Sequence, residues 1–208
     1  MKNAHIKLPK KFYTQSAIKL AQNLIGMQIN RKIRDQIISG IIVEAEAYTG
    51  ENDPASHAYK GKTRRTEVMF DEGGKAYVYF TYGNHYCFNI VAGKKGKAGA
   101  VLIRGVEPIQ GIEIMKKNRA TDNFYNLTNG PGKFAKAFGI DKSLYGEDLT
   151  GDLIYLTKPS LNKKVKVTKS KRIGITRNTE KLYRFFMKDN PFVSGSKRIN
   201  NSKNDNSK

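Results

Sequence analysis

The chain has 208 residues, which is enough for one domain with a sizeable core. Its 38 lysine and arginine residues outnumber 18 acidic residues, and the resulting formal charge of +20 favours a polyanionic partner, with nucleic acid first. An anionic membrane surface fits less well, because the sequence has no long basic amphipathic stretch and no apolar run of transmembrane length.

Two helices are predicted with defined ends. The first follows Thr14, its expected N-cap, and ends at Gly26. Its apolar residues recur at helical spacing and are Ala17, Leu20, Ala21, Leu24 and Ile25. The second follows the turn at 129–132 and ends before Gly139, with a stripe formed by Phe134, Ala135 and Phe138. Further helix candidates are segments 109–118 and 142–148.

Seven stretches have the composition of strands, and short turns separate several of them. They are residues 40–48, 76–82, 86–92, 100–106, 152–157, 163–168 and 182–187. This hairpin-like spacing favours a single α+β domain, in which helices surround a mixed, largely antiparallel sheet. The stretch from Ser194 to Lys208 is rich in serine, asparagine and lysine, and we expect it to be a disordered, basic tail.

The strand predicted over 40–48 places two carboxylates on one face. Alternation gives an apolar face, made of Ile41, Val43, Ala45 and Ala47, and an opposite face made of Ile42, Glu44, Glu46 and Tyr48. Two carboxylates beside a phenol ring are typical of a catalytic site. However, most glutamates are exposed, so the pattern by itself favours solvated surface residues.

Aromatic residues are dense in the next two predicted strands, at Tyr77, Tyr79, Phe80, Tyr82, Tyr86 and Phe88. Core packing explains such rings, and stacking on bases, at about 1–3 kcal/mol each, is the functional alternative. The Gly83-Asn84 turn puts Tyr82 at a hairpin tip, where a ring can act as a wedge between base steps. A two-residue loop pairs Tyr79 with Phe88, whereas a three-residue loop pairs it with Asn89, and both registers remain open.

Several polar residues need partners or have alternative explanations. Arg104 lies on an otherwise apolar strand and requires a carboxylate or a phosphate, with Glu44, Glu46, Glu107 and DNA as candidates. The single cysteine, Cys87, excludes an intramolecular disulfide and is expected to be buried rather than nucleophilic.

The remaining motifs concern the binding of phosphate and of metal ions. The turn at Gly130-Pro131-Gly132-Lys133 is a candidate for phosphate binding through backbone N–H groups, although its spacing is not that of a nucleotide P-loop. The histidines, His5, His57 and His85, are too scattered to predict a metal site.

An ordered series of motifs runs along most of the chain. The motifs are Val43-Glu44-Ala45-Glu46-Ala47-Tyr48, Asp53, Ala55-Ser56-His57, Met69-Phe70, Ala76-Tyr77-Val78-Tyr79-Phe80-Thr81-Tyr82-Gly83, Cys87-Phe88-Asn89, Val101-Leu102-Ile103-Arg104-Gly105-Val106-Glu107-Pro108, Asn129-Gly130-Pro131-Gly132-Lys133 and Asn190-Pro191-Phe192-Val193-Ser194. Together they resemble the alkyladenine (3-methyladenine) DNA glycosylase family, and the similarity covers about residues 8–195. The resemblance implies a glycosylase domain over 1–195, with a curved, mostly antiparallel sheet and a protruding β-hairpin, and a basic disordered tail at 196–208.

The resemblance also implies roles for individual residues. Glu46 aligns with the general base, and Arg104 aligns with the arginine that positions this carboxylate and the attacking water. Residues that sandwich a flipped base align with Tyr48, His57 and Tyr79.

The remaining aligned residues concern lesion choice and base flipping. Asn89 aligns with the amide that crowds the 2-amino group of guanine. Tyr82 aligns with the ring that fills the vacated place in the base stack, and Leu102 with an apolar residue near that ring. Asn84-His85 beside the tip is more polar than the family pattern, which bears on the strength and lesion range of flipping.

The implied activity is base-excision repair of double-stranded DNA. The enzyme would flip out alkylated purines, above all 3-methyladenine, with 7-methylguanine and hypoxanthine as further candidates, and hydrolyse the N-glycosidic bond to leave an abasic site. One base suffices because a cationic purine leaves readily. No metal, cofactor or nucleophilic lysine is implied. We therefore expect a monofunctional, monomeric, cytoplasmic enzyme, associated with the nucleoid in a bacterium and not with a membrane.

Two other classes of function fit part of the sequence. A non-catalytic nucleic-acid-binding module explains the charge and the tyrosines, but acidic residues such as Glu44 and Glu46 on one face would weaken its contact with phosphates. An RNA-modifying enzyme could read exposed bases by stacking, although no cofactor-binding glycine fingerprint supports a methyltransferase of this kind.

Overall fold

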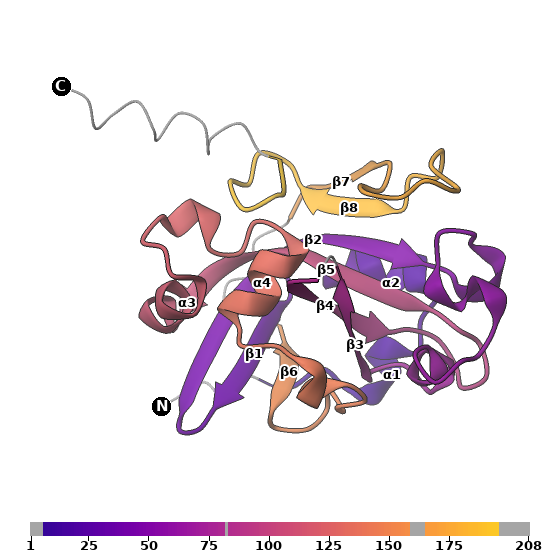
Figure 1. Ribbon diagram of the computed structural model, residues 1–208, viewed down its shortest axis with the longest axis horizontal. Coiled ribbons are helices and arrows are strands. Elements are labelled where there is room, and N and C mark those ends of the chain that lie inside the picture. Colours follow the sequence, from indigo (N-terminus) through magenta and orange to yellow (C-terminus); the bar gives the residue numbers. More distant parts are fainter. Residues whose placement is uncertain (1–5, 82, 159–164, 196–208) are drawn as a thin grey trace.

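An eight-stranded sheet organises the fold (Figure 1). The computed structural model describes residues 6–81, 83–158 and 165–195, and every strand pairing in these ranges is antiparallel. The strand order is β3-β4-β5-β2-β1-β6, with β8 paired to both β2 and β7. The strands are β1 Gln28–Ile33, β2 Gln36–Tyr48, β3 Ala76–Thr81, β4 His85–Val91, β5 Ala100–Gln110, β6 Ile154–Thr157, β7 Val167–Ser170 and β8 Arg184–Met187.

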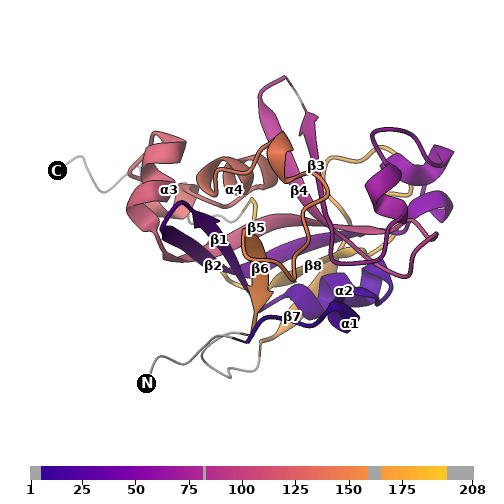
Figure 2. The same ribbon diagram turned by 90° about the horizontal axis from the view of Figure 1, so that it is seen from below.

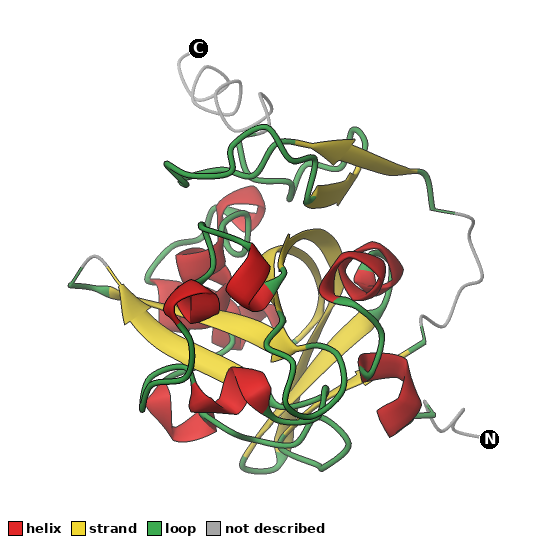
Figure 3. Cartoon of the chain, turned by 90° about the vertical axis from the view of Figure 1, so that its right-hand side faces the viewer, coloured by secondary structure: helices red, strands yellow, loops and turns green. Residues whose placement is uncertain are grey.

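Short helices surround this sheet. The α-helices are α1 Lys10–Tyr13, α2 Ala17–Leu24, α3 Ile112–Arg119 and α4 Pro131–Ala137, and the 3-10 helices are η1 Gly50–Asn52, η2 His57–Lys60, η3 Glu67–Phe70, η4 Phe124–Asn126 and η5 Lys142–Leu144. Helix α2 packs on β2 and β5, and α4 packs on β4 and β5. The β3–β4 hairpin extends away from the body (Figure 2 and Figure 3). These features confirm the predicted α+β fold class.

Strand β2 is the central strand of the site. It pairs with β5 along most of its length, while its first part pairs with β1 and Glu44–Glu46 pair with β8. A chain segment near residue 185 therefore lies directly beside the two glutamates of β2. The sheet in this way brings the C-terminal part of the domain to the strand that carries the predicted catalytic base.

An irregular pairing between β2 and β5 changes the predicted strand faces. Ile42 lies opposite Val106, but Ala45 lies opposite Ile103, so the register shifts on both sides of Glu44. Ile42 consequently joins the main core with Ala45, whereas Val43 packs against Phe192 in a separate cluster. The expected single apolar face was wrong: Ile41 and Val43 lie in one cluster, while Ala45 and Ala47 lie in the main core, because a β-bulge breaks strict alternation. Both glutamates of this strand are also fully buried, contrary to the surface interpretation.

Several element boundaries differ from the sequence prediction. Ser16, not Thr14, caps α2 by accepting from the Lys19 N–H, because a four-residue helix, α1, occupies the preceding segment. Strand β5 continues to Gln110, which delays the helix expected over 109–118. The helix candidate at 142–148 is reduced to the 3-10 helix η5.

One strand was not expected from the sequence, and two predicted ranges lie partly or wholly outside the described residues. Strand β1 was not predicted. The strand expected over 163–168 is found as β7, at Val167–Ser170, although residues 163–164 of the expected range lie outside the described residues, as does the predicted tail at 196–208.

The hairpin register differs from both predicted alternatives. Tyr79 lies opposite Cys87, and Tyr77 lies opposite Asn89. The strands flank residues 82–84, with Gly83 in the left-handed region at φ 68°. Both predicted loops began at Gly83, whereas the connection between the strands begins at residue 82, so each prediction shifted the residue pairs of β3 and β4. Asn89 nevertheless shares a face with the Tyr77 and Tyr79 rings, since residues two apart on β3 point the same way.

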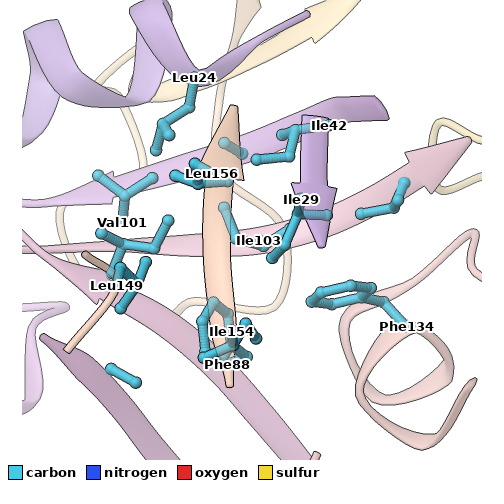
Figure 4. Packing of buried hydrophobic residues seen from close by; sticks show 14 of the residues in the cluster. Leu24, Ile29, Ile42, Phe88, Val101, Ile103, Phe134, Leu149, Ile154 and Leu156 are labelled. Atoms are coloured by element: carbon cyan, nitrogen blue, oxygen red, sulfur yellow. The ribbon is translucent and has the colours of Figure 1, made fainter. Parts of the chain in front are cut away.

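The main hydrophobic core lies where the sheet meets α2 and α4. Figure 4 labels part of this core, namely Leu24, Ile29, Ile42, Phe88, Val101, Ile103, Phe134, Leu149, Ile154 and Leu156, all of which are buried. The rings of Phe134 on α4 and Phe88 on β4 pack edge to face, with 6.2 Å between centroids, and this contact joins the helix to the sheet. No helix in the described part of the chain is long and apolar enough to cross a membrane.

We expect Phe134→Ala to destabilise the fold by about 3–5 kcal/mol, because it leaves a cavity in a fully buried site between Phe88 and Phe138. Chemical denaturation monitored by circular dichroism measures this change. Phe80→Ala is the matched control, since the Phe80 side chain is 52% exposed, and its cost should be about 1 kcal/mol or less. Equal losses for the two variants would contradict this description of the core.

Candidate active site

A cavity of about 570 Å³ lies between the β3–β4 hairpin, the ends of β2 and β5 and the segment 173–177. Its size falls within the range of small-molecule sites, about 300–1,000 Å³. Six of the predicted site residues line it, namely Tyr48, His57, Tyr79, Asn89, Leu102 and Arg104. The sequence patterns did not predict the participation of Met69, Tyr77, Cys87 or the segment 173–177. The fold therefore brings together most of the residues that the resemblance identified.

Aromatic rings form one wall of the cavity. The His57 ring meets the Tyr79 ring edge to face, with 4.6 Å between centroids, and His57 Nδ1 lies 2.8 Å from the Tyr77 hydroxyl. The Arg65 guanidinium lies 5.2 Å from the centre of the Tyr79 ring. Desolvation among these groups, followed by the charge of Arg65, lowers the pKa of His57 to about 4. The imidazole is therefore neutral at physiological pH and adds no positive charge to the cavity.

An amide with a fixed orientation, that of Asn89, and a buried thiol, that of Cys87, also line the cavity. Asn89 is 3% exposed, and its Nδ2 donates to the Tyr77 carbonyl at 3.1 Å, which fixes the amide plane in the wall. Cys87 is buried, as predicted, and burial raises the pKa of its thiol. A protonated, enclosed thiol is a weak nucleophile, so this residue serves the shape of the cavity.

The Glu46 carboxylate lies directly behind the cavity wall. Its Oε2 accepts from the Tyr48 hydroxyl at 3.0 Å and from Arg104 Nη1 at 3.4 Å, and its Oε1 accepts from the Ile173 N–H at 2.8 Å. The residue is fully buried and is not itself part of the lining, but all three donors belong to lining residues. Burial raises the pKa of Glu46, against the opposing effect of Arg104 and the hydrogen bonds.

Glu44 is held by a different and fuller set of donors. Its Oε1 accepts from Arg184 Nε at 2.6 Å, from the Ser194 hydroxyl at 2.8 Å and from Arg104 Nε at 3.2 Å. Its Oε2 accepts from the Ser194 N–H at 2.7 Å. Arg104 is thus paired with both glutamates of β2, whereas the third candidate, Glu107, accepts from Asn190 instead. These bonds explain why the 190–194 motif is needed near the site.

A second buried ion pair lies beside Glu46 and escaped the sequence patterns. Arg172 and Asp53 have fully buried side chains and form two hydrogen bonds, at 2.5 and 2.9 Å. Asp53 belongs to one of the family-like motifs but carries no predicted role, and Arg172 is surrounded in sequence by lysines typical of an exposed stretch. The only available signal was that motif aspartate, whose partner lies 119 positions away.

The predicted phosphate-binding turn is mostly separate from the cavity. Only Pro131 of this turn lines it, and the Lys133 ammonium donates to Asn126 and Asn129. Gly132 packs closely on the His85 ring, since a Cβ there would lie 2.9 Å from its Cγ. The tip residue Tyr82 lies outside the described residues. Within the described ranges, no cluster of three or more metal-ligating side chains occurs.

We expect His57 to titrate well below the ordinary imidazole pKa of about 6.5, with a midpoint near pH 4. The chemical shifts of its ring carbons, followed by NMR between pH 3.5 and 8, measure this midpoint, and His57→Gln assigns the signal. A midpoint at or above 6.5 would show that the ring is not desolvated by its neighbours.

The chain is similar over most of its length to one protein family and to several named proteins. A family model described as methylpurine-DNA glycosylase (MPG) matches residues 11–191. A protein of Carboxydothermus hydrogenoformans is 45% identical over 188 residues, which cover 90% of this chain and 98% of that protein. One of Chlorobium phaeobacteroides is 44% identical over 192 residues, 92% of this chain and 96% of that protein. Both carry the name "Putative 3-methyladenine DNA glycosylase". The chain belongs to the methylpurine-DNA glycosylase family.

Proposed function

We propose that this protein is a monofunctional base-excision repair enzyme that flips an alkylated purine, 3-methyladenine above all, out of double-stranded DNA and hydrolyses its N-glycosidic bond. The observation that carries the proposal is the buried Glu46 carboxylate, held by three cavity-lining residues directly behind an aromatic pocket. Family membership supports a DNA glycosylase. The net charge of +20 supports DNA as the partner.

The reaction needs one base and no acid. The bond between C1′ of the sugar and the purine nitrogen breaks, and the purine departs with the bonding electrons, which neutralise its positive charge. The oxygen of a water molecule binds C1′, and the proton of that water passes to Glu46. We propose that this water enters between Arg104 and Ile173, two of the three lining residues that donate to the carboxylate. The product is an abasic site.

The aromatic walls of the cavity suit a cationic base, although Arg104 and Arg177 also line it. Its aromatic walls attract a cation by about 0.5–2 kcal/mol for each close ring contact, and His57 stays neutral beside them. We propose that Tyr48, His57 and Tyr79 enclose the flipped base. Asn89, fixed by its bond to Tyr77, would then crowd the 2-amino group of guanine and favour adenine-type lesions, with 7-methylguanine and hypoxanthine as secondary substrates.

The remaining assignments concern the path of the DNA. Tyr82 would fill the gap left by the flipped base, with Leu102 beside it, and Gly130, Gly132 and Lys133 would contact phosphates. No lysine lines the cavity in the described part of the chain, which favours hydrolysis by water over a Schiff-base intermediate. We further propose that the enzyme acts as a monomer in the cytoplasm, on the nucleoid if the source is a bacterium.

We expect Glu46→Gln to slow single-turnover release of 3-methyladenine from alkylated duplex DNA by about 10²–10⁴-fold, because an amide cannot accept the proton of water. Binding to a duplex that contains an abasic-site analogue should persist. Glu113→Gln removes the same charge from an exposed position on α3 and should excise normally. Excision at a near-normal rate by Glu46→Gln would refute the assignment of the base.

We expect Tyr82→Ala to weaken base flipping, because the vacated place in the stack loses its substitute ring. Fluorescence of a 2-aminopurine placed beside the lesion measures flipping, and single-turnover excision measures its consequence. Tyr82→Phe keeps the ring and should retain most of both signals. If flipping and excision by Tyr82→Ala equalled those of the unchanged protein, the proposed wedge would be wrong.

A further inference from the structure

The segment that supplies the Ile173 N–H to Glu46 has no helix or strand of its own between Lys171 and Tyr183. An irregular segment is held in place only by its contacts, so a backbone donor within it needs an anchor. Arg172, the residue next to this donor, is 6% exposed, while Ile173 is 43% exposed. The buried neighbour, not the exposed one, therefore fixes the position of the N–H group.

Arg172 joins three separate parts of the chain. Its Nη1 donates to the Ala47 carbonyl of β2 at 2.9 Å and to Asp53, which follows η1. Its guanidinium lies 4.7 Å from the centre of the Tyr48 ring and 5.4 Å from that of Tyr183. A planar, bidentate guanidinium that stacks between two rings has little freedom to move.

Asn178 completes this arrangement from the far end of the segment. Its Nδ2 donates to Asp53 Oδ1 at 2.8 Å, so Asp53 binds the segment on both sides of residues 173–177. Asp53 itself is fixed by the N–H groups of Thr49 and Ala55. The Asp53 carboxylate therefore binds the residues on either side of the segment 173–177, which forms one wall of the cavity.

This arrangement acts on one specific oxygen of the proposed base. Oε2 of Glu46 has donors from Tyr48 and Arg104, whereas the Ile173 N–H, at 2.8 Å, is the donor to Oε1. If the segment 173–177 moved, Oε1 would lose this hydrogen bond and the Glu46 carboxylate could rotate about its Cγ–Cδ bond. Loss of this bond would therefore change both the pKa and the orientation of the Glu46 carboxylate.

We propose that Asp53, Arg172 and Asn178 form a positioning clasp that holds the Ile173 N–H against Oε1 of Glu46. The inference deepens the proposed function and rests on it, since the role of Glu46 as base belongs to that proposal. None of the three clasp residues touches the reacting atoms. They act through the backbone of the segment that they anchor, and they stabilise the ionised carboxylate by keeping its hydrogen bond in place.

The test uses variants that keep the charge of Arg172, because this guanidinium also acts on Glu46 directly through its field. Other charged or titratable groups around Glu46 are Glu44 and Tyr48 on its own strand, Arg104 on β5 and Arg184 on β8. Asp53→Asn makes the neighbourhood more positive, so electrostatics alone would lower the pKa of Glu46. Loss of the clasp would raise it, and the two explanations predict opposite signs.

We expect Asp53→Asn to move the titration midpoint of Glu46, followed by NMR of protein labelled at the glutamate carboxyl carbon and assigned with Glu46→Gln, to higher pH by roughly one unit. The acid limb of the pH profile for single-turnover 3-methyladenine excision should move in the same direction, because the protonated base is inactive. Asp148→Asn is the matched control, since Asp148 pairs with Lys10 and Lys75, and it should leave both curves unchanged.

Asn178→Gly is the gentler variant and decides the matter if Asp53→Asn does not fold. Asn178 has φ of 52°, a conformation that glycine adopts readily, so this change removes the amide donor without straining the backbone. We expect a smaller upward shift of the same two curves. Ala120→Gly, at φ of 51° on the exposed end of α3, is its control.

Unchanged midpoints in the folded variants, or a shift to lower pH, would overturn the clasp. Uniformly slower excision at every pH, with an unchanged Glu46 midpoint, would also overturn it, because that result indicates a structural role alone. If the unchanged protein excises no base at all, the proposed function fails, and the NMR titration still decides whether the clasp controls Glu46.

Discussion

One guanidinium, that of Arg104, lies between two carboxylates that have no exposure to solvent. Its Nε is 3.2 Å from Glu44 and its Nη1 is 3.4 Å from Glu46. A buried carboxylate without a partner costs several kcal/mol, so the strand that carries both glutamates can be buried only where this arginine reaches them. The β-bulge makes that reach possible, because the shift in register leaves Arg104 without a paired residue on β2. The aromatic cavity is then built on the same strands.

The two carboxylates share this arginine and are equally buried, but their other hydrogen-bond donors differ. Glu44 has four donors and ties β8 and the chain near Ser194 to the sheet, so its lone pairs are occupied by structural bonds. Glu46 has three donors, all from groups that face the cavity, and burial raises the pKa of its carboxyl. Environments that separate two carboxyl groups in this way assign them different tasks. We infer that Glu44 holds β8 and the chain near Ser194 against the sheet, and that Glu46 is free to take up a proton.

Local patterns in the sequence could predict part of this site and could not predict the rest. Strand alternation placed Glu44 and Glu46 together, but their burial depends on Arg104 and Arg184, which lie 58 and 140 positions from their partners. The bulge at Val43 and the hairpin register depend on pairing between strands, which alternation alone does not determine. The family resemblance identified six of the residues that line the cavity as site residues, but not the segment 173–177. Arg172 was missed because a buried arginine and a solvated one look alike in a lysine-rich stretch.

The overall charge of the protein contributes affinity for DNA, whereas the cavity contributes selection of the base. A charge of +20 attracts the phosphates of any duplex equally, so it raises affinity along the whole polymer without selecting a base. Selection must therefore arise where the base is bound, in a cavity lined by uncharged rings and a neutral His57. Arg104 and Arg177 also line this cavity, and the charge of Arg104 is balanced by the buried carboxylates of Glu44 and Glu46. Under the proposed function, a methylated purine would bring a positive charge that the rings and the buried carboxylate attract, and a damaged base would cost less to flip. The same charge would make the base a good leaving group, so that a single carboxylate would be enough.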